Sequence, residues 1–278
     1  EQTSSDSVTS FDSDGFTVGN NTGVNSSGDT LVAWNWKAGG TAVTNDDGSI
    51  QSTVSANTEA GFSIISYIGN GTAGATVGHG LSQAPDMIIV KNRGIITGTN
   101  HDWMVYHSSN TSAPETDYLR LNLTNGTADA VSYWNDTAPT SSVITLGSGT
   151  NVNKNTEEHI VYCFHGVEGY SKFGSSRRIG SPDGPFVYTG FRPAFLLVKR
   201  SSNTGGWAIL DNKRDTYNDM FRRLEADTSS AEVTSVSYLD TVSNGFKIRT
   251  TNGTYNTSAA TYIYMAFAEQ PFKYSNAR

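Results

Sequence analysis

Residues 84–91 read APDMIIVK, and residues 192–199 read RPAFLLVK. Each stretch has a proline near its start, a run of apolar residues in its middle and a lysine at its end. Short apolar runs that lie between turn-forming residues are typical of buried β-strands. The chain therefore repeats one strand pattern.

Other segments match in the same order after each of these strands. A strand that contains a tryptophan comes next, then two shorter segments, and finally an apolar closing strand. The matched pairs are residues 102–106 and 206–210, 118–121 and 221–224, 132–133 and 237–238, and 159–164 and 262–267. Equivalent positions are about 105 residues apart, which is the size of a compact sandwich domain rather than of a solenoid unit.

The rest of the chain also alternates short apolar runs with turns. Asn-Gly pairs at 70–71, 125–126 and 244–245 are typical of tight hairpin turns. Helical periodicity is nearly absent, and the one candidate helix, residues 215–224, is explained equally well as a loop that enters a strand. We predict an all-β fold made of tandem antiparallel β-sandwich domains of the jelly-roll or lectin-like type.

The matches divide most of the chain into two full repeats. Residues 61–168 form the first full β-sandwich repeat, and residues 185–278 form the second. Residues 169–184 are predicted to link them.

The N-terminal region matches only part of a repeat. Residues 10–18 and 30–36 resemble residues 238–248 and 261–267, so we predict that residues 1–40 are the C-terminal half of an incomplete copy. Residues 41–60 are predicted to be a linker. An uncovered half-sandwich exposes strand edges and apolar faces, so these strands need a partner. The missing strands lie upstream of residue 1, or the half copy completes another copy or another chain.

Composition narrows the classes of function. The formal net charge of the 278 residues is -7, and no basic cluster is present, which argues against nucleic acid as a partner. No run of eighteen apolar residues occurs, so we expect no membrane insertion. Aromatic residues make up 11% of the chain, enough to fill a core. The single cysteine, Cys163, is predicted to be a small buried apolar residue.

Patterns for catalysis or metal binding are weak. No nucleophile elbow or phosphate-binding loop occurs, and no two histidines have the spacing of a helical zinc site. His159 and His165 flank a strand and are predicted to mark its solvated ends. The carboxylate doublets, Glu115 with Asp117 and Glu157 with Glu158, are best explained as solvated loop charges. We predict no catalytic residues, no metal site and no cofactor.

Trp103 and Trp207 occupy the same place in the two repeats. Exposed aromatic rings beside Asn, Asp and Gly are a common way to build a glycan site, so both are candidates for stacking on a sugar. A sandwich also needs a large residue to fill its centre, and equal placement in both copies favours that core role.

Four phrases carry a resemblance to a known family. They are residues 10–17 (SFDSDGFT), 33–40 (AWNWKAGG), 71–81 (GTAGATVGHGL) and 262–269 (YIYMAFAE). They resemble a repeated β-rich domain of unknown function in virion structural and tail-fibre-like proteins of marine tailed bacteriophages. The resemblance covers essentially the whole chain and implies no catalytic residues. The missing half of the first copy departs from the family pattern.

Together, the repeats and the resemblance predict a non-enzymatic virion structural protein, a tail fibre, spike or decoration component. Its expected partners are other virion proteins, host surface glycan and further copies of itself, as a trimer if it forms a fibre. Its expected location is the virion, an extracellular particle assembled in the host cytoplasm. One alternative is a tailspike depolymerase with two carboxylates about 5 to 9.5 Å apart. Another is a purely architectural capsid or fibre module without a ligand.

Overall fold

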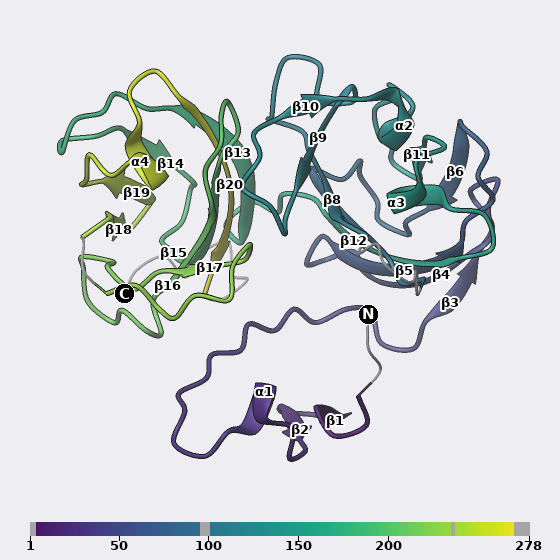
Figure 1. Cartoon of the computed structure of the whole chain (residues 1–278), viewed down its shortest axis with the longest axis horizontal. Coiled ribbons are helices and arrows are strands. Elements are labelled where there is room, and N and C mark those ends of the chain that lie inside the picture. The colour runs from purple at the N-terminus through teal and green to yellow at the C-terminus, as the bar shows by residue number, and fades with distance from the viewer. Residues whose placement is uncertain (1–3, 95–100, 235–236, 270–278) are drawn as a thin grey trace. The chain divides into compact units, whose positions relative to one another are not determined.

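A computed structural model describes residues 4–94, 101–234 and 237–269. The chain forms two compact units, residues 1–36 and residues 37–278. The fold is all-β: several antiparallel sheets account for most of the regular structure, and the described helices have only four residues each (Figure 1).

The larger unit contains a first segment, which we define as residues 43–164. Its strands are β3 (Val43–Asn45), β4 (Ser52–Asn57), β5 (Phe62–Ile68), β6 (Ala75–Gly78), β7 (Met87–Asn92), β8 (Trp103–His107), β9 (Asp117–Arg120), β10 (Ala128–Asp129), β11 (Val143–Leu146) and β12 (Glu158–Phe164). Its helices are α2 (Val131–Trp134) and α3 (Thr150–Asn153). The large sheet has the order β10-β9-β8-β7-β12-β5-β4-β3, and β11 pairs with β6 in a small sheet.

The second segment, residues 171–268, follows in the same unit. Its elements are β13 (Ser171–Arg177), β14 (Phe186–Tyr188), β15 (Pro193–Arg200), β16 (Trp207–Asp211), β17 (Leu224–Glu225), β18 (Leu239–Val242), β19 (Gly245–Ile248), α4 (Gly253–Asn256) and β20 (Thr261–Ala268). One sheet has the order β13-β20-β15-β16-β17, and the other has the order β14-β19-β18. In the large sheet of the first segment, neighbouring strands run in the order β5-β12-β7-β8-β9, which matches β13-β20-β15-β16-β17 strand by strand. The matched strands also follow one another in the same order along the chain.

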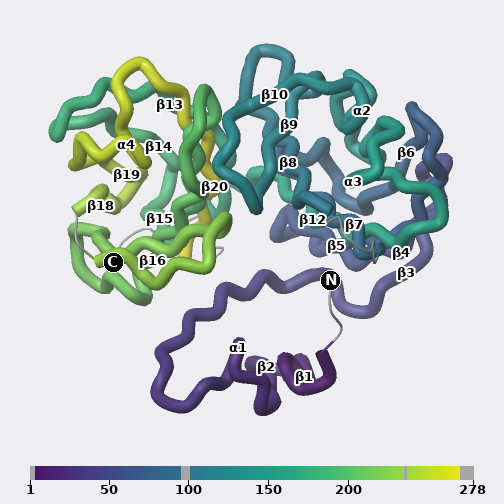
Figure 2. The backbone as a smooth tube through the Cα atoms, viewed as in Figure 1, coloured from purple at the N-terminus to yellow at the C-terminus, as the bar shows by residue number. Residues whose placement is uncertain are grey.

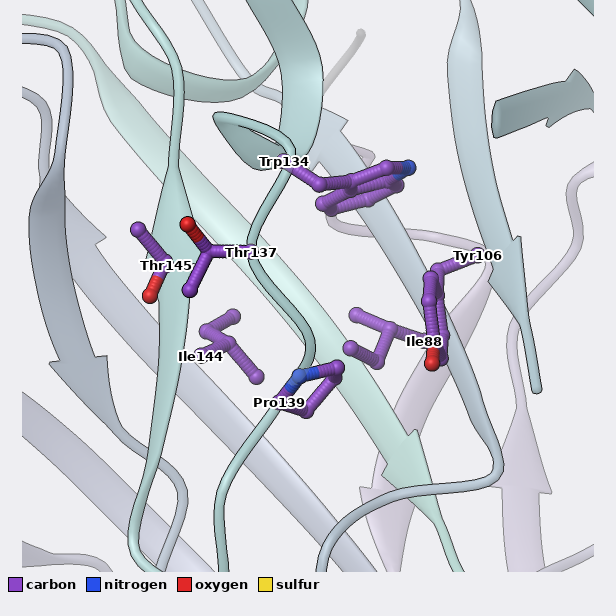
Figure 3. A pocket seen from close by; sticks show the side chains of 7 residues that line it. All are labelled: Ile88, Tyr106, Trp134, Thr137, Pro139, Ile144 and Thr145. Carbon is purple, nitrogen blue, oxygen red and sulfur yellow. The ribbon is translucent and has the colours of Figure 1, made fainter. Parts of the chain in front are cut away.

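Each segment has its own apolar core, made by side chains from both of its sheets. In the first segment, Ile65 and Val90 of the large sheet pack in one cluster with Val77 and Leu146 of the small sheet. Alternate residues along these strands point inward, which is why short apolar runs suffice to build the core. At one edge of this core, the rings of Tyr106 and Trp134 meet edge to face, with their centroids 6.0 Å apart, beside a small pocket (Figure 3).

A buried asparagine occupies the same place in the two segments. The Oδ1 atom of Asn153 accepts hydrogen bonds from the N–H groups of Asn70 and Gly71, and its Nδ2 group donates to the carbonyls of Thr72 and Gly147. The Oδ1 atom of Asn256 accepts from Ile179 and Gly180, and its Nδ2 group donates to Ser181 and Thr250. Both asparagines are 0% exposed, so one side chain ties a helix end to the turn after β5 in the first segment and to the turn after β13 in the second.

The smaller unit consists of a β-hairpin, a short helix and an extended stretch. Strands β1 (Val8–Phe11) and β2 (Phe16–Val18) are antiparallel, and the turn between them is closed by a hydrogen bond from the N–H of Asp12 to the carbonyl of Gly15 at 2.9 Å. Helix α1 (Thr22–Asn25) follows. Residues 29–39, all of them described, belong to no strand and run as an extended chain (Figure 2).

Residues 41–60 and 169–184 were predicted to be linkers, but the structure places strands in both. Strands β3 and β4 extend the large sheet of the first segment, and β13 is the edge strand beside β20. Small polar residues take part of their buried positions, such as Ser52 at 2% exposure and Ser171 at 4%. Strands β4 and β13 each have one buried large apolar residue, Val54 and Phe173, so the apolar signal of these strands is weak. Consequently β13, and not β14, corresponds to β5, and the second segment starts earlier than predicted.

The sequence left residues 215–224 open between a helix and a loop that enters a strand, and the structure shows the loop, which leads into β17 at Leu224. The buried carboxylate of Asp215 accepts hydrogen bonds from the N–H groups of Phe221 and Arg222 and holds this loop.

One other local prediction changes. The ends of the strand between His159 and His165 are not solvated, since these side chains are 0% and 4% exposed. Cys163 is buried, as predicted.

Candidate interaction site

Two equivalent lysine–tryptophan pairs lie on the large sheets, on the face that points away from the core. Lys91 is the cross-strand partner of Trp103 between β7 and β8, and Lys199 is the partner of Trp207 between β15 and β16. The lysine Nζ lies 5.6 Å from the ring centroid of Trp103 and 5.9 Å from that of Trp207. Both distances are within the range of a cation–π interaction.

The pair in the second segment is covered by the first segment. Lys199 is 0% exposed and Trp207 is 1% exposed. The Nζ of Lys199 donates hydrogen bonds to the carbonyl of Thr124, at 3.0 Å, and to two carbonyls of its own segment. The indole Nε1 of Trp207 donates to the carbonyl of Arg120 at 2.8 Å. Residues 120–124 of the first segment therefore cover this pair and accept its hydrogen bonds.

The backbone strengthens this contact. The N–H of Gly205 donates to the carbonyl of Thr124, and the N–H of Thr127 donates to the carbonyl of Ser201, both at 2.8 Å. Burial lowers the pKa of Lys199 to about 8. The ammonium still carries most of its charge at pH 7, and its carbonyl partners replace the water that burial removes.

The two large sheets also share an apolar contact next to this pair. Phe164 of β12 packs against Phe173 of β13 and Phe267 of β20, with ring centroids 6.1 Å away in both cases. The Nε2 of His107 lies 3.1 Å from the carbonyl oxygen of Tyr264. Burial lowers the pKa of His107 to about 4, so this ring is neutral at pH 7 and donates to that carbonyl.

The pair in the first segment has different surroundings. The Nζ of Lys91 donates to the carbonyl of His101 in its own segment. Trp103 and Lys91 both remain partly exposed. Beside them, Asp102 forms an ion pair with Arg120 at 3.1 Å and accepts a hydrogen bond from Asn122 at 2.9 Å. A partly exposed aromatic ring, a lysine and a held carboxylate therefore lie together at one end of β8.

The structure thus separates the two candidate sugar platforms of the sequence. Trp207 is 1% exposed and has no ring face open to a ligand, but it lies on the outer face of its sheet and not among the core residues of the second segment, so it does not fill the centre of a sandwich either. Its surroundings come from two segments, a contact that one sequence position does not reveal. Trp103 keeps an accessible surface, and we treat it, with Lys91 and Asp102, as the candidate interaction site.

The other polar candidates are held in local contacts. Glu157 lies 3.4 Å from His101 and 3.2 Å from Lys154, whereas Glu158 pairs with Arg93. Asp117 is 8% exposed and accepts a hydrogen bond from Thr111. Among the described residues, no three His, Cys, Asp or Glu side chains come together in a way that would hold a metal ion.

Sequence reasoning missed Asn153 and Asn256. Both end a four-residue segment, TNVN at 150–153 and GTYN at 253–256, and both make a hydrogen bond to the carbonyl six residues earlier. Because the chain is rich in Asn, Ser and Thr, a short segment that ends in Asn does not stand out from the rest of the sequence. Arg178 was missed as well: it is 1% exposed, and its guanidinium lies 5.1 Å from the ring centroid of Tyr262.

Comparisons with known proteins bear on the whole chain. A family model described as a domain of unknown function (DUF7483) matches residues 1–271, and the chain belongs to that family. Searches of the curated proteins and of the solved structures found no match. No helix in the described ranges is long and apolar enough to span a membrane.

Proposed function

We propose that this chain is a non-enzymatic structural component of a bacteriophage virion, in a tail fibre, spike or decoration protein. The resemblance of its sequence phrases supports the virion assignment. The observation that supports a structural role is the way in which the first segment covers the lysine–tryptophan pair of the second.

The architecture behind this proposal is a tandem array of antiparallel β-sandwiches. The recurring strand order, the two cores and the matched asparagines support the interpretation of residues 43–164 and 171–268 as two copies of one domain. These two copies pack through the outer faces of their large sheets, and residues 120–124, at and after the end of β9 in the first copy, cap the pair of the second.

The face around Trp103 is the open equivalent of the covered face of the second segment. We propose that it contacts a neighbouring virion subunit, either a further copy of this domain or another virion protein. In the covered pair, a loop supplies one carbonyl to the lysine and one to the indole. Lys91 and Trp103 have the same two kinds of donor, an ammonium and an indole N–H, so a loop that presents two backbone carbonyls suits them as well. A homo-oligomer, such as a trimer in a fibre, would bring such a loop of one copy next to the Trp103 face of another.

The location of the chain is the most direct test of this function. Antibodies against the 278-residue chain, with gold labels, are expected to mark the fibres, spikes or capsid of intact particles. Particles without label, both intact and disrupted, would contradict the virion assignment. Release of reducing ends from host polysaccharide by the purified chain would support the depolymerase alternative instead.

A variant tests the contact face itself. Trp103→Ser with Lys91→Glu is expected to reduce incorporation into particles about 10-fold, because it removes an aromatic anchor and reverses a charge. Ile179→Ser, at an apolar residue of the second segment that is 56% exposed, is the matched control and should incorporate normally. Equal incorporation of both variants would show that the Trp103 face is not the contact.

Trp103 also favours one second candidate, a host glycan as the ligand of the same face. The ring lies next to Asp102, which Asn122 and Arg120 hold in place, and such side chains bind sugar hydroxyls. Binding to a glycan array that is lost in Trp103→Ala would favour this ligand over a protein partner.

A further inference from the structure

The smaller unit has the same elements as the second half of the second segment. Strands β1 and β2, helix α1 and residues 30–36 correspond to β18, β19, α4 and β20. The N-cap side chains agree, since Asn21 and Asn252 each accept a hydrogen bond from the N–H two residues later, at 2.8 and 2.9 Å. The residue three positions after each helix has a positive φ, 86° at Gly28 and 61° at Ala259.

Asn25 occupies the place of Asn153 and Asn256. Its Nδ2 group donates to the carbonyl of Gly19 at 2.7 Å, six residues earlier, as the other two asparagines do. In the larger unit, the other partners of these asparagines come from the turn after β5 or β13. No N–H group of the described chain reaches the Oδ1 atom of Asn25, which lies on an exposed residue. One half of the hydrogen-bonding site is therefore present, and its complement is not.

The backbone after α1 shows the same half-formed pattern. In the first segment, the N–H of Thr156 donates to the carbonyl of Gly69, and the N–H of Gly69 donates to Glu157. In the second segment, the N–H of Ala259 donates to the carbonyl of Arg178, and the N–H of Arg178 donates to the carbonyl of Ala260. Gly28 and Asp29 hold these positions in the smaller unit. They are free to pair with a strand end in the same way.

Apolar residues that are buried in the second segment have exposed equivalents in the smaller unit. Phe16 is 37% exposed, whereas Phe246 is 0% exposed. Val8 is 41% exposed and Leu239 is 0% exposed; Leu31 is 56% exposed and Tyr262 is 0% exposed. Val8, Phe16 and Leu31, with other apolar residues, line a groove of about 550 Å³. An apolar surface of this kind is stabilised when another element covers it.

We propose that the face formed by Val8, Phe16, Asn25 and Leu31 docks the first half of a further copy of the domain. This proposal rests on the tandem repeats described above, but not on the Trp103 contact. The occupant is a β-strand followed by a turn of the form X-Gly-Ser/Thr, as at 70–72 and 179–181, whose glycine has a φ near 70°. Its N–H groups bind the Oδ1 of Asn25, and the strands that follow fill the groove.

The occupant is a first half that stands ahead of this second half in the order of the repeat. In both segments of the larger unit, the first half comes earlier in the same chain and pairs with the half that follows it. Both of those first halves are already paired within the larger unit, so a second copy of residues 37–278 has no unpaired first half to offer.

Hydrogen exchange tests the proposal in the whole chain. Two lengthened variants of the 278-residue chain are compared with it. One has a second copy of residues 170–237 joined ahead of residue 1, and the other has a second copy of residues 61–130 there. In at least one of them, the amides of residues 8–36 are expected to exchange about 100-fold more slowly than in the 278-residue chain. Asn25→Ala should abolish most of this slowing, whereas Asn20→Ala, at an exposed residue nearby, should not.

Two results would overturn the proposal. One is unchanged exchange of residues 8–36 in both lengthened variants. The other is slow exchange in the 278-residue chain itself, together with a doubled mass in light scattering, since a second copy would then be the occupant. Neither result depends on labelling of particles or on the Trp103 variants, so failure here is distinguishable from failure of the proposed function.

Discussion

The two lysine–tryptophan pairs have the same side chains on the same strands, yet they differ in their surroundings. Lys199 and Trp207 are buried beneath residues 120–124 of the first segment, whereas Lys91 and Trp103 stay partly exposed. The same difference separates Asn256, with all its partners, from Asn25, with one. The free energy that such a side chain contributes therefore depends more on whether another segment covers it than on the strand or helix that carries it.

The largest expected effect comes from the tryptophans. Trp207→Ala should lower the free energy of unfolding by about 4 kcal/mol, because it leaves a cavity between two sheets and an unpaired carbonyl at Arg120. Trp103→Ala should lower it by about 1 kcal/mol, since its ring is only partly buried. Urea unfolding of both variants measures the difference. Equal losses would mean that the contact between the segments contributes little.

The asparagines give the next effect. Asn153→Ala and Asn256→Ala should each lower the free energy of unfolding by about 3 kcal/mol, because each leaves several buried backbone groups without a partner. Asn25→Ala should lower it by less than about 0.5 kcal/mol, since its neighbours can bond to water. Thermal unfolding of the three variants tests this order. A large loss for Asn25→Ala would show that the smaller unit is already covered.

Acidification should lower the free energy of unfolding. Burial lowers the pKa of His107 to about 4 and that of His159 to about 4, whereas an unfolded histidine titrates near 6.5. The unfolded chain therefore binds more protons between pH 6.5 and 4. The stability is fully present above about pH 6.5 and is lost as the pH falls toward 4, by up to about 3 kcal/mol for each ring.

His107→Gln separates the two histidines. Glutamine can still donate to the carbonyl of Tyr264 but does not titrate, so this variant should lose about half of the pH dependence between pH 6.5 and 4. His159→Gln should remove the other part. Unfolding in urea at several pH values measures both. A slope that neither variant changes would place the titrating groups elsewhere.

The smallest effect is expected from the lysines. Lys199→Met keeps the apolar stem but leaves three carbonyls without their donor, and it should lower the free energy of unfolding by about 1.5 kcal/mol. Lys91→Met should lower it by about 0.5 kcal/mol or less, because Lys91 is partly exposed. The urea concentrations at the unfolding midpoints of the two variants measure this difference. A larger loss of stability in Lys91→Met than in Lys199→Met would contradict the prediction.

Much of the fold was predictable from local patterns. The closing strands predicted at 159–164 and 262–267 lie within one residue of the bounds of β12 and β20. Both are nearly continuous apolar runs, which give a strong local signal. By contrast, β4 and β13 were predicted as linkers, because small polar residues such as Ser52 and Ser171 occupy many of their positions and leave little apolar periodicity. The buried histidines escaped prediction for a related reason, since burial depends on the neighbouring strands.

The candidate site was predictable only in part. The sequence singled out Trp103 and Trp207 as equivalent, but left open whether they are core or exposed. The contact with Arg120 that buries Trp207 joins residues 87 positions apart. The bonds of Asn153 to Asn70 span a similar distance. No local pattern encodes such pairs.

The sequence by itself determined that the chain is all-β and that one set of strand segments recurs along it, because strand periodicity and turn chemistry are local properties. Only the tertiary structure decided which tryptophan is buried, which asparagine is satisfied and which apolar face is left open. Those outcomes depend on burial and hydrogen bonding between segments far apart in the chain, and these contacts form only when whole sheets pack together.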